Sequence, residues 1–385
     1  MKNLIIIIVL FSSSNFLVAQ EATHTYTKPE QLRDGIKTAF LKDVGIDEHT
    51  MNAATDSIIK GVYPNIHSLL IIRDNKLVYE NYFPGNDVIF GKGAVAFVNH
   101  HRDSLHDIRS ITKSVVSAAV MIAIGQGRIK NVDQRVFDFF PEYAKYDTGI
   151  KKQLTIKHLL AMSSGIEWDE SMSYADTANS ERRMTSAKDP VEYFLSQRSI
   201  HKPNKVFNYS GGCTQTLAAI VAKATGMRID YFVEQFLFQP LGITVYEWVK
   251  RSDSLPRAAS GLRMRSRDMA KLGLLYMNEG KWKNKRIIPA DLVKESLKLQ
   301  IEREKPNGYG YQFWLWTDTV RNTPLTTVQA VGNGNQRIAI NKKLNLVIVI
   351  TAGNYNREDR FKNSDDIYLD FIYPAAMRNY KSKKK

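Results

Sequence analysis

The tetrapeptide Ser110-Ile111-Thr112-Lys113 stands at the head of an apolar run, Ser-Val-Val-Ser-Ala-Ala-Val-Met-Ile-Ala-Ile over residues 114–124. A run that is apolar nearly all round predicts a helix buried on every side. Residues three apart share a helix face, so the Lys113 Nζ can reach the Ser110 Oγ. Burial and the positive helix N-terminus disfavour an ammonium, so we expect a neutral Lys113 that activates Ser110 as a nucleophile.

Two later stretches carry groups of matching chemistry. Phe207-Asn208-Tyr209-Ser210-Gly211-Gly212 places a tyrosine on a glycine-rich bend before a helix. The pKa of a phenol falls beside a lysine, so Tyr209 is expected to carry protons to and from a leaving group. Gly332-Asn333-Gly334-Asn335-Gln336 is predicted to open a strand with little side-chain bulk. Substrate can approach such a backbone, and its N–H groups can form an oxyanion hole.

Strand patterns lie near both ends of the chain, and helical patterns lie between them. Residues 67–82 and 336–351 each hold two apolar runs around a polar turn, which predicts two β-hairpins. Helices are predicted from Thr155, over 214–224 and from Ser266. We therefore predict an α+β fold, in which an antiparallel β-sheet built from both chain ends is flanked by helices and carries an inserted, mostly helical subdomain.

The predicted domain boundaries follow from this pattern. A main domain is expected over 51–378, preceded by an N-terminal extension over 20–50 and followed by a basic tail over 379–385. Within it, the sheet subdomain takes about 51–105 plus 310–378, and the helical subdomain takes about 106–309. The polar stretch Glu170–Lys188 is predicted to be a long loop, and loops of this length often act as lids.

The first residues are typical of a secretory leader, with Lys2, an apolar run over 4–11 and Ala19 at the expected cleavage point. We predict a signal peptide over 1–19 and a periplasmic or secreted protein, with a retained N-terminal anchor as the alternative. Cys213 is the single cysteine of the 385 residues, so no disulfide can form within the chain. Its place before an apolar helix predicts a buried, inert thiol.

The net charge of +15 is dispersed along the chain, apart from the basic tail. Basic residues do not alternate with aromatic ones, so nucleic acid is not an expected partner. Weak attraction to an anionic envelope surface fits the same charge. The oligomeric state is not indicated by the sequence.

A serine–lysine pair, a Tyr-Ser-Gly bend and a glycine-rich strand, in this order, resemble the penicillin-recognising serine hydrolases. The likeness is closest to the branch with class C β-lactamases, DD-peptidases and family VIII esterases, which uses a tyrosine in the second motif. The resemblance runs from about Ser68 to Asn356. Further matching segments lie at 108–114, 158–165, 260–264 and 351–355.

The resemblance implies a role for each matching residue. Ser110 would be the nucleophile, Lys113 the base and Tyr209 the proton relay to the leaving group. The backbone N–H groups of Ser110 and Gln336 would hold the oxyanion, and Asn333, Gly334 and Asn335 would line the substrate site. The reaction would be acyl transfer through an acyl-enzyme, without metal or cofactor.

Two departures from the family pattern bear on the substrate. Gly211 stands where lactamases have asparagine, and Asn333 stands where they have the lysine or histidine that binds a substrate carboxylate. Loss of such a charged hydrogen bond costs about 1.5–3 kcal/mol, and the neighbouring Arg337 points to the other face of a strand. Asn335 replaces a glycine and is expected to narrow the cleft. These changes favour an esterase or amidase over a dedicated β-lactamase, and the expected partner is a small-molecule ester, amide or peptide substrate.

Other functions remain as alternatives. A β-lactamase, a D-Ala-D-Ala carboxypeptidase or a D-aminopeptidase would keep the same chemistry, whereas a non-catalytic envelope-polymer binder would keep only the fold. His158 is expected to be structural, because a serine–lysine scheme needs no histidine. The histidines and aspartates over residues 100–107 match no metal-ligand spacing, and we predict a polar loop there.

Overall fold

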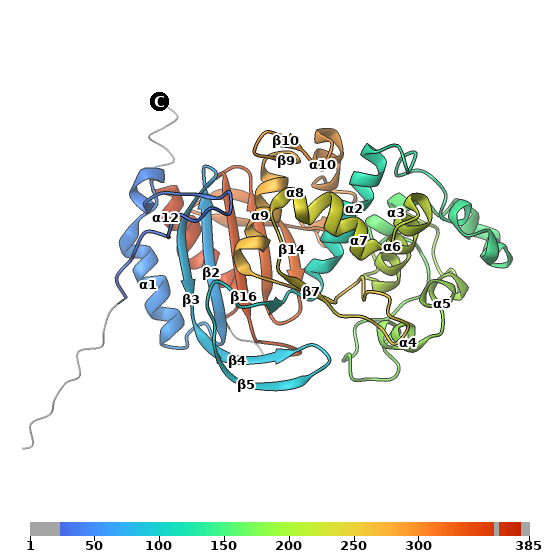
Figure 1. The fold of residues 1–385 in the computed structure, drawn as a ribbon, viewed down its shortest axis with the longest axis horizontal. Helices are drawn as coiled ribbons and strands as arrows, with labels where there is room; N and C mark the ends of the chain where they lie inside the picture. Colours follow the sequence, from blue (N-terminus) through green and yellow to red (C-terminus); the bar gives the residue numbers. More distant parts are fainter. Residues whose placement is uncertain (1–23, 358–361, 379–385) are drawn as a thin grey trace, which may run out of the picture.

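The computed structural model describes residues 24–357 and 362–378, so the predicted signal peptide and basic tail lie outside the described residues. Its main element is a nine-stranded sheet in the order β1-β3-β2-β16-β15-β14-β13-β12-β11 (Figure 1). The strands are β1 (Lys37–Thr38), β2 (Ile66–Arg73), β3 (Lys76–Tyr82), β11 (Ile301–Glu302), β12 (Gly308–Tyr309), β13 (Trp314–Val320), β14 (Thr323–Gly332), β15 (Gln336–Asn341) and β16 (Leu346–Ala352). The early strand β2 pairs with the last strand, β16, so both chain ends build one sheet.

All neighbours in this sheet are antiparallel except β1 and β3, which pair in parallel at one edge. The two predicted hairpins are β2–β3 and β15–β16. At the first turn Asp74 and Asn75 have φ values of 51° and 60°. Asparagine and aspartate tolerate this left-handed conformation, which tight hairpin turns require. The α+β fold and the sheet made from both ends are therefore confirmed.

Each central strand is buried on both faces, because helices cover both sides of the sheet. Residues of alternate parity enter two separate apolar clusters: Leu70 and Ile72 join one, and Leu69 and Ile71 join the other. Helix α1 (Glu48–Ile59) and the C-terminal helices α11 (Ser364–Ile367) and α12 (Tyr373–Met377), joined by the π-helical η6 (Tyr368–Ile372), cover one face (Figure 1). Helices α2 (Ile111–Gly125) and α9 (Ser266–Met277) lie on the other.

Most of the remaining elements form the region beside the sheet, but η1 belongs to the sheet region, where Leu41 and Val44 join the same apolar cluster as α1. The helices are α3 (Ile156–Leu160), α4 (Ser180–Ser186), α5 (Pro190–Ser196), α6 (Gly211–Thr225), α7 (Ile229–Val233), α8 (Gln239–Leu241) and α10 (Ala290–Ser296), with short η1 (Leu41–Val44), η2 (Val136–Phe139), η3 (Pro141–Tyr146), η4 (Gly149–Gln153) and π-helical η5 (Glu234–Phe238). Small strands are β4 (Pro84–Ile89) with β5 (Gly93–Asn99), β6 (His106–Asp107) with β7 (Tyr246–Trp248) and β8 (Leu262–Met264), and β9 (Lys281–Trp282) with β10 (Lys285–Arg286). Among the described helices, none combines the length and apolar character needed to cross a membrane.

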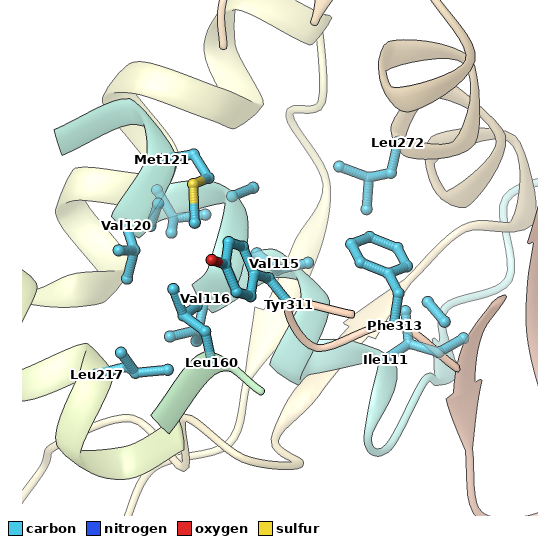
Figure 2. Close-up of a cluster of buried hydrophobic side chains, with 14 of the residues drawn as sticks. Ile111, Val115, Val116, Val120, Met121, Leu160, Leu217, Leu272, Tyr311 and Phe313 are labelled. Carbon is cyan, nitrogen blue, oxygen red and sulfur yellow. The ribbon is translucent and has the colours of Figure 1, made fainter. Parts of the chain in front are cut away.

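Helix α2 joins the two regions. It is buried from Ile111 to Ala123, as the apolar run predicts. Figure 2 shows its Val116 and Val120 near Leu160 and Leu217 of the helical region, while Ile111 lies near Phe313 and Leu272 on the sheet side. The start of α2 is therefore fixed by packing from two directions, and this is where Ser110 stands.

Three details differ from the sequence predictions. Helix α9 begins at Ser266 itself, and Arg265 precedes it without a side-chain cap. The stretch Glu170–Lys188 is not one loop, because it contains α4, capped by the Asn179 side chain at the N–H groups of Glu181 and Arg182. From residue 24 onward, the predicted N-terminal extension adds β1 and buried residues such as Leu41 to the sheet region. The domain division itself stays a prediction.

Candidate active site

Ser110 and Lys113 converge at the start of α2, as their spacing predicts. The Lys113 ammonium donates hydrogen bonds to the Ser110 Oγ at 3.1 Å and to the Ala259 carbonyl at 3.0 Å. The side chain of Lys113 is only 1% exposed, so its position is fixed by the packing around it. The Ser110 hydroxyl caps no helix N–H group and stays available for chemistry.

The backbone just before the nucleophile is held under strain. Arg109 has a φ of 49°, a conformation that is unfavourable for a residue with a side chain. Its guanidinium stacks on Phe90 at 4.4 Å and on Tyr355 at 4.5 Å, and it pairs with Asp107 at 3.3 Å. These contacts hold the turn that presents Ser110.

The charge state of Lys113 corrects the prediction of a neutral lysine. Burial lowers the pKa of Lys113, as expected, but Tyr209, Glu181 and Glu170 together raise it above the ordinary lysine value. The Glu181 Oε2 lies 3.9 Å from the Lys113 Nζ. The sequence pattern gave the helix field and the burial but not these carboxylates, which come from a distant segment. Lys113 is therefore an ammonium in the resting site.

Tyr209 lies beside the pair, on the bend that leads into α6. The Lys113 Nζ is 4.9 Å from the centre of its ring. Burial raises the pKa of Tyr209 more than Lys113 lowers it, so the expected fall in this pKa is wrong. The ring stacks on Trp314 at 5.4 Å. Tyr209 therefore keeps its proton in the resting site and can donate it.

Two carboxylates, Glu170 and Glu181, complete the charged group, and sequence reasoning missed both. Glu170 accepts hydrogen bonds from the Trp168 Nε1 at 2.6 Å and from the Gly211 N–H. Burial and the neighbouring Glu181 raise the pKa of Glu170 to about 8. Both residues lie in the polar stretch read as a loop, and nothing in their local spacing indicated that they face Lys113.

The third predicted segment has a different structure from the one expected. Asn333 to Asn335 form the turn between β14 and β15 and do not open a strand. Gly332 must be glycine, because a Cβ there would lie 2.3 Å from the Ile108 carbonyl oxygen. The Asn333 amide is paired with Asn356, donating to Oδ1 at 2.6 Å and accepting from the backbone N–H at 2.9 Å.

A pocket of about 500 Å³ opens beside Ser110, lined by the β4–β5 hairpin, α4 and the loop before β8. Of the third segment, only Asn333 lines it; Gly334 and Asn335 line a separate hollow, so Asn335 does not narrow the cleft at Ser110. The Gln336 side chain is fully buried and accepts from the Ala352 N–H at 3.1 Å. The oxyanion role of its backbone N–H stays a prediction.

Three other residues occupy the places that their sequence context indicates. Arg337 is bound to Asp365 at 2.6 Å and does not line the pocket. His158 forms a capping box with Thr155 and is structural. Cys213 is buried, and burial raises the pKa of its thiol to about 12.

The histidines near residue 100 form a packed group with His67. One ligand atom from each of His67, Asp87 and His100 lies within 4.8 Å of the others. However, the His67 and His100 rings stack at 3.9 Å with an interplanar angle of 18°. One ion cannot lie in two nearly parallel ring planes, so this arrangement is that of an imidazole stack. His67 Nδ1 is also hydrogen-bonded to His106 Nε2 at 2.8 Å.

Comparison with known proteins identifies the family of the chain. The Beta-lactamase family model matches residues 57–369. The chain is 24% identical over 178 residues to Protein flp of Staphylococcus aureus; the match covers 43% of this chain and only 35%, about a third, of that relative.

Two solved structures share the fold. A family VIII carboxylesterase superimposes with a TM-score of 0.65 at 14% identity, covering 85% of this chain and 96% of the other. The penicillin-binding protein homologue from Pyrococcus abyssi superimposes with a TM-score of 0.61 at 17% identity, covering 86% and 78%. These two structures share the fold, and the family model, which spans most of the chain, shows that the protein belongs to the Beta-lactamase family.

Proposed function

We propose that this protein hydrolyses an ester or amide bond through an acyl-enzyme on Ser110. The observation that carries the proposal is the 3.1 Å contact between the buried Lys113 Nζ and the Ser110 Oγ, at the wall of a 500 Å³ pocket. A serine hydroxyl inside a pocket becomes an activated nucleophile once the lysine amine beside it has released its proton and can act as a base.

The proton path follows from the charge state of the site. Lys113 holds a proton at rest, so it must pass this proton to the Glu170–Glu181 carboxylates before it can act as a base. It then takes the Ser110 proton as Oγ bonds to the substrate carbonyl carbon. Tyr209 donates its proton to the leaving group as the scissile bond breaks, and is reprotonated from Lys113. Water then attacks the acyl-enzyme by the same path in reverse.

The oxyanion of both tetrahedral intermediates would be held by the backbone N–H groups of Ser110 and Gln336. Such donors are effective because they are oriented before charge develops. No step in this scheme requires a metal or a cofactor.

The neutral sheet side of the pocket favours an ester or amide over a β-lactam. Asn333 is hydrogen-bonded to Asn356 and offers no cation at the position where lactamases and DD-peptidases have one. The fold likeness to a family VIII carboxylesterase is in keeping with this substrate class. β-Lactamase, D-Ala-D-Ala carboxypeptidase and D-aminopeptidase activity, and non-catalytic polymer binding, are the alternatives.

The test uses a fluorophosphonate probe and p-nitrophenyl butyrate. We expect wild type to be labelled and to turn over the ester, and Ser110→Ala to lose both. Ser252→Ala, which removes an exposed serine, should behave as wild type. Absence of labelling and turnover in wild type would reject the enzyme. Faster turnover of nitrocefin, or release of D-Ala from a cell-wall peptide, would favour the alternative substrates.

We further propose that the protein is exported to the periplasm or secreted after cleavage following Ala19. The support is the sequence of the first residues alone. Determination of the N-terminus of the protein made by its own cell tests this: Gln20 is the expected first residue, and an intact Met1 would refute cleavage.

A further inference from the structure

Arg257 is an unpaired cation on the wall of the active-site pocket. It lines the same pocket as Ser110, and its Nε is buried without a hydrogen-bond partner. Within residues 24–357 and 362–378, no carboxylate lies within ion-pair distance of its guanidinium. A half-buried guanidinium loses hydration and normally recovers it through an acid or a carbonyl. Arg257 has neither in direct contact; burial lowers its pKa, and the more distant charge of Glu181 offsets this only in part.

The neighbouring arginines show how unusual this is. Arg251, six residues earlier, donates to the carbonyls at the end of α4, at 3.0 Å to Met184 and 2.7 Å to Ala187. Arg263, six residues later, pairs with Asp107 at 2.6 Å. Both serve to hold the structure together. Arg257 stands between them in the chain but uses its guanidinium for no such contact.

The aromatic ring of Phe90 positions Arg257 relative to the nucleophile. The Arg257 guanidinium lies 5.0 Å from the ring centre, and the Arg109 guanidinium lies 4.4 Å from the same ring. Arg109 directly precedes Ser110. Both guanidiniums therefore contact the same ring, Phe90, and one of them belongs to the residue directly before Ser110. Stacking restricts the rotamers of Arg257 without using its N–H donors, which remain free for a ligand.

The charge of the pocket wall points to an anion. Three arginines line the pocket, Arg109, Arg182 and Arg257, against one carboxylate, Glu181. Glu181 is already engaged, because it accepts from the Ser260 Oγ at 3.1 Å and lies 3.9 Å from the Lys113 Nζ. Arg109 is likewise engaged, with Asp107 at 3.3 Å. Arg182 and Arg257 then remain as positive charges of the wall without an ion pair among the described residues, and they attract a negative group on an entering ligand.

We propose that Arg257 is the anion-recognition residue of this pocket and that the substrate is an ester or amide carrying a carboxylate, held by the Arg257 guanidinium. This rests on the proposed hydrolase function. A guanidinium binds a carboxylate through two parallel N–H···O bonds, which fixes the orientation of the substrate as well as its charge. The cation that binds the substrate would then come from the loop before β8, next to the β4–β5 hairpin, and not from the β14–β15 turn that carries Asn333.

The experiment compares matched substrates that differ only in one charge. On the acyl side they are mono-p-nitrophenyl succinate and p-nitrophenyl butyrate; on the leaving-group side they are 4-carboxyphenyl butyrate and 4-carbamoylphenyl butyrate. We compare kcat/KM for wild type, Arg257→Gln and the control Arg128→Gln, which removes an exposed arginine outside the pocket. If Arg257→Gln does not fold, Arg257→Lys replaces it, because it keeps the charge but loses the two-pronged geometry.

We expect Arg257→Gln to lower kcat/KM on the order of ten- to a hundred-fold for the carboxylate member of at least one pair, mainly through KM, and less than about two-fold for the neutral member. Arg257→Lys should fall between. Equal loss on both members of each pair, or no loss, would show that Arg257 only packs on Phe90 and would overturn the proposal.

A binding measurement separates this proposal from the hydrolase itself. Binding of glutarate is measured calorimetrically with wild type and Arg257→Gln. If no ester is hydrolysed but glutarate binding depends on Arg257, the anion site stands and the hydrolase falls. If esters are hydrolysed but neither turnover of carboxylates nor glutarate binding depends on Arg257, the anion site falls and the hydrolase stands.

Discussion

The two walls of the active-site pocket are built on different principles. On the helical side, Lys113, Glu170 and Glu181 form one charged group with Tyr209 beside it, and Glu181 is the member that lines the pocket. The sheet wall, at the turn between β14 and β15, is neutral, and its Asn333 and Asn356 are hydrogen-bonded to each other. The helical side places titratable groups next to the nucleophile, whereas the sheet side fixes the conformation of a turn.

This difference shows that the groups that carry protons in the proposed reaction lie on one side of the pocket. In the family pattern, the sheet side supplies a cation for the substrate. Here that position is uncharged, and Arg257, which has no ion pair among the described residues, lines the pocket from the loop before β8. The comparison is useful because each wall can be changed separately, with different expected effects on rate, pH dependence and stability.

The largest effect should come from Lys113→Met. The variant keeps a long apolar stem but removes the amine that takes the Ser110 proton, so kcat/KM for p-nitrophenyl butyrate should fall on the order of a thousand-fold or more. Lys130→Met, which changes an exposed lysine after α2, is the control and should be unchanged. A loss of less than ten-fold in the folded variant would show that the helical wall does not supply the base.

Glu170→Gln should change the pH profile of the same reaction. The pKa of Glu170 is raised to about 8, so its carboxylate can accept the Lys113 proton only above that pH. We expect wild-type kcat/KM to rise with pH through about 8, and the variant to lack this rise and to be on the order of ten-fold slower at high pH. Glu167→Gln, at an exposed position three residues earlier, should keep the wild-type profile. An unaltered rise in Glu170→Gln would remove this carboxylate from the proton path.

The same variant should change how stability depends on pH. The folded pKa of Glu170, about 8, exceeds its ordinary value of 4.5, so its protonated form contributes stability below pH 4.5 that is lost as the pH rises through about 8. Glutamine resembles the protonated form at every pH. The Tm of Glu170→Gln should therefore match wild type at acidic pH and exceed it by a few degrees at pH 9. A Tm difference that is the same at pH 5 and pH 9 would contradict the raised pKa.

The sequence predicted the sheet and the Ser110–Lys113 pair because both depend on local periodicity. Alternation over 67–82 fixes which face of a strand is buried, and a three-residue spacing brings two helical side chains together. The Asp74-Asn75 turn follows from residue chemistry in the same way. Features determined within one helix or one hairpin were predicted correctly.

The charge states could not be predicted in this way, because they depend on contacts between distant segments. Lys113 meets Glu181 across 68 residues and Tyr209 across 96. The segment with Glu170 and Glu181 is poor in apolar residues and was read as a loop, although Asn179 caps a helix there and the site buries both carboxylates. Burial alone indicates a neutral lysine; burial beside two carboxylates gives an ammonium.

The smallest effect is expected on the sheet wall, at Asn333. Asn333→Ala removes the reciprocal pair with Asn356, which should cost about 1 kcal/mol of unfolding free energy and change kcat/KM for p-nitrophenyl butyrate less than about three-fold, because no proton passes through this turn. Asn356→Ala is the matched variant. Asn356→Ala removes only the bond from the Asn333 Nδ2, because the Asn356 backbone N–H still donates to the Asn333 Oδ1, so this variant should lose less stability. The double variant should be about as stable as Asn333→Ala alone in urea unfolding, since Asn333→Ala already removes both bonds. A large loss of kcat/KM in Asn333→Ala at unchanged stability would show that Asn333 takes part in the reaction, and would contradict a purely structural role for the sheet wall.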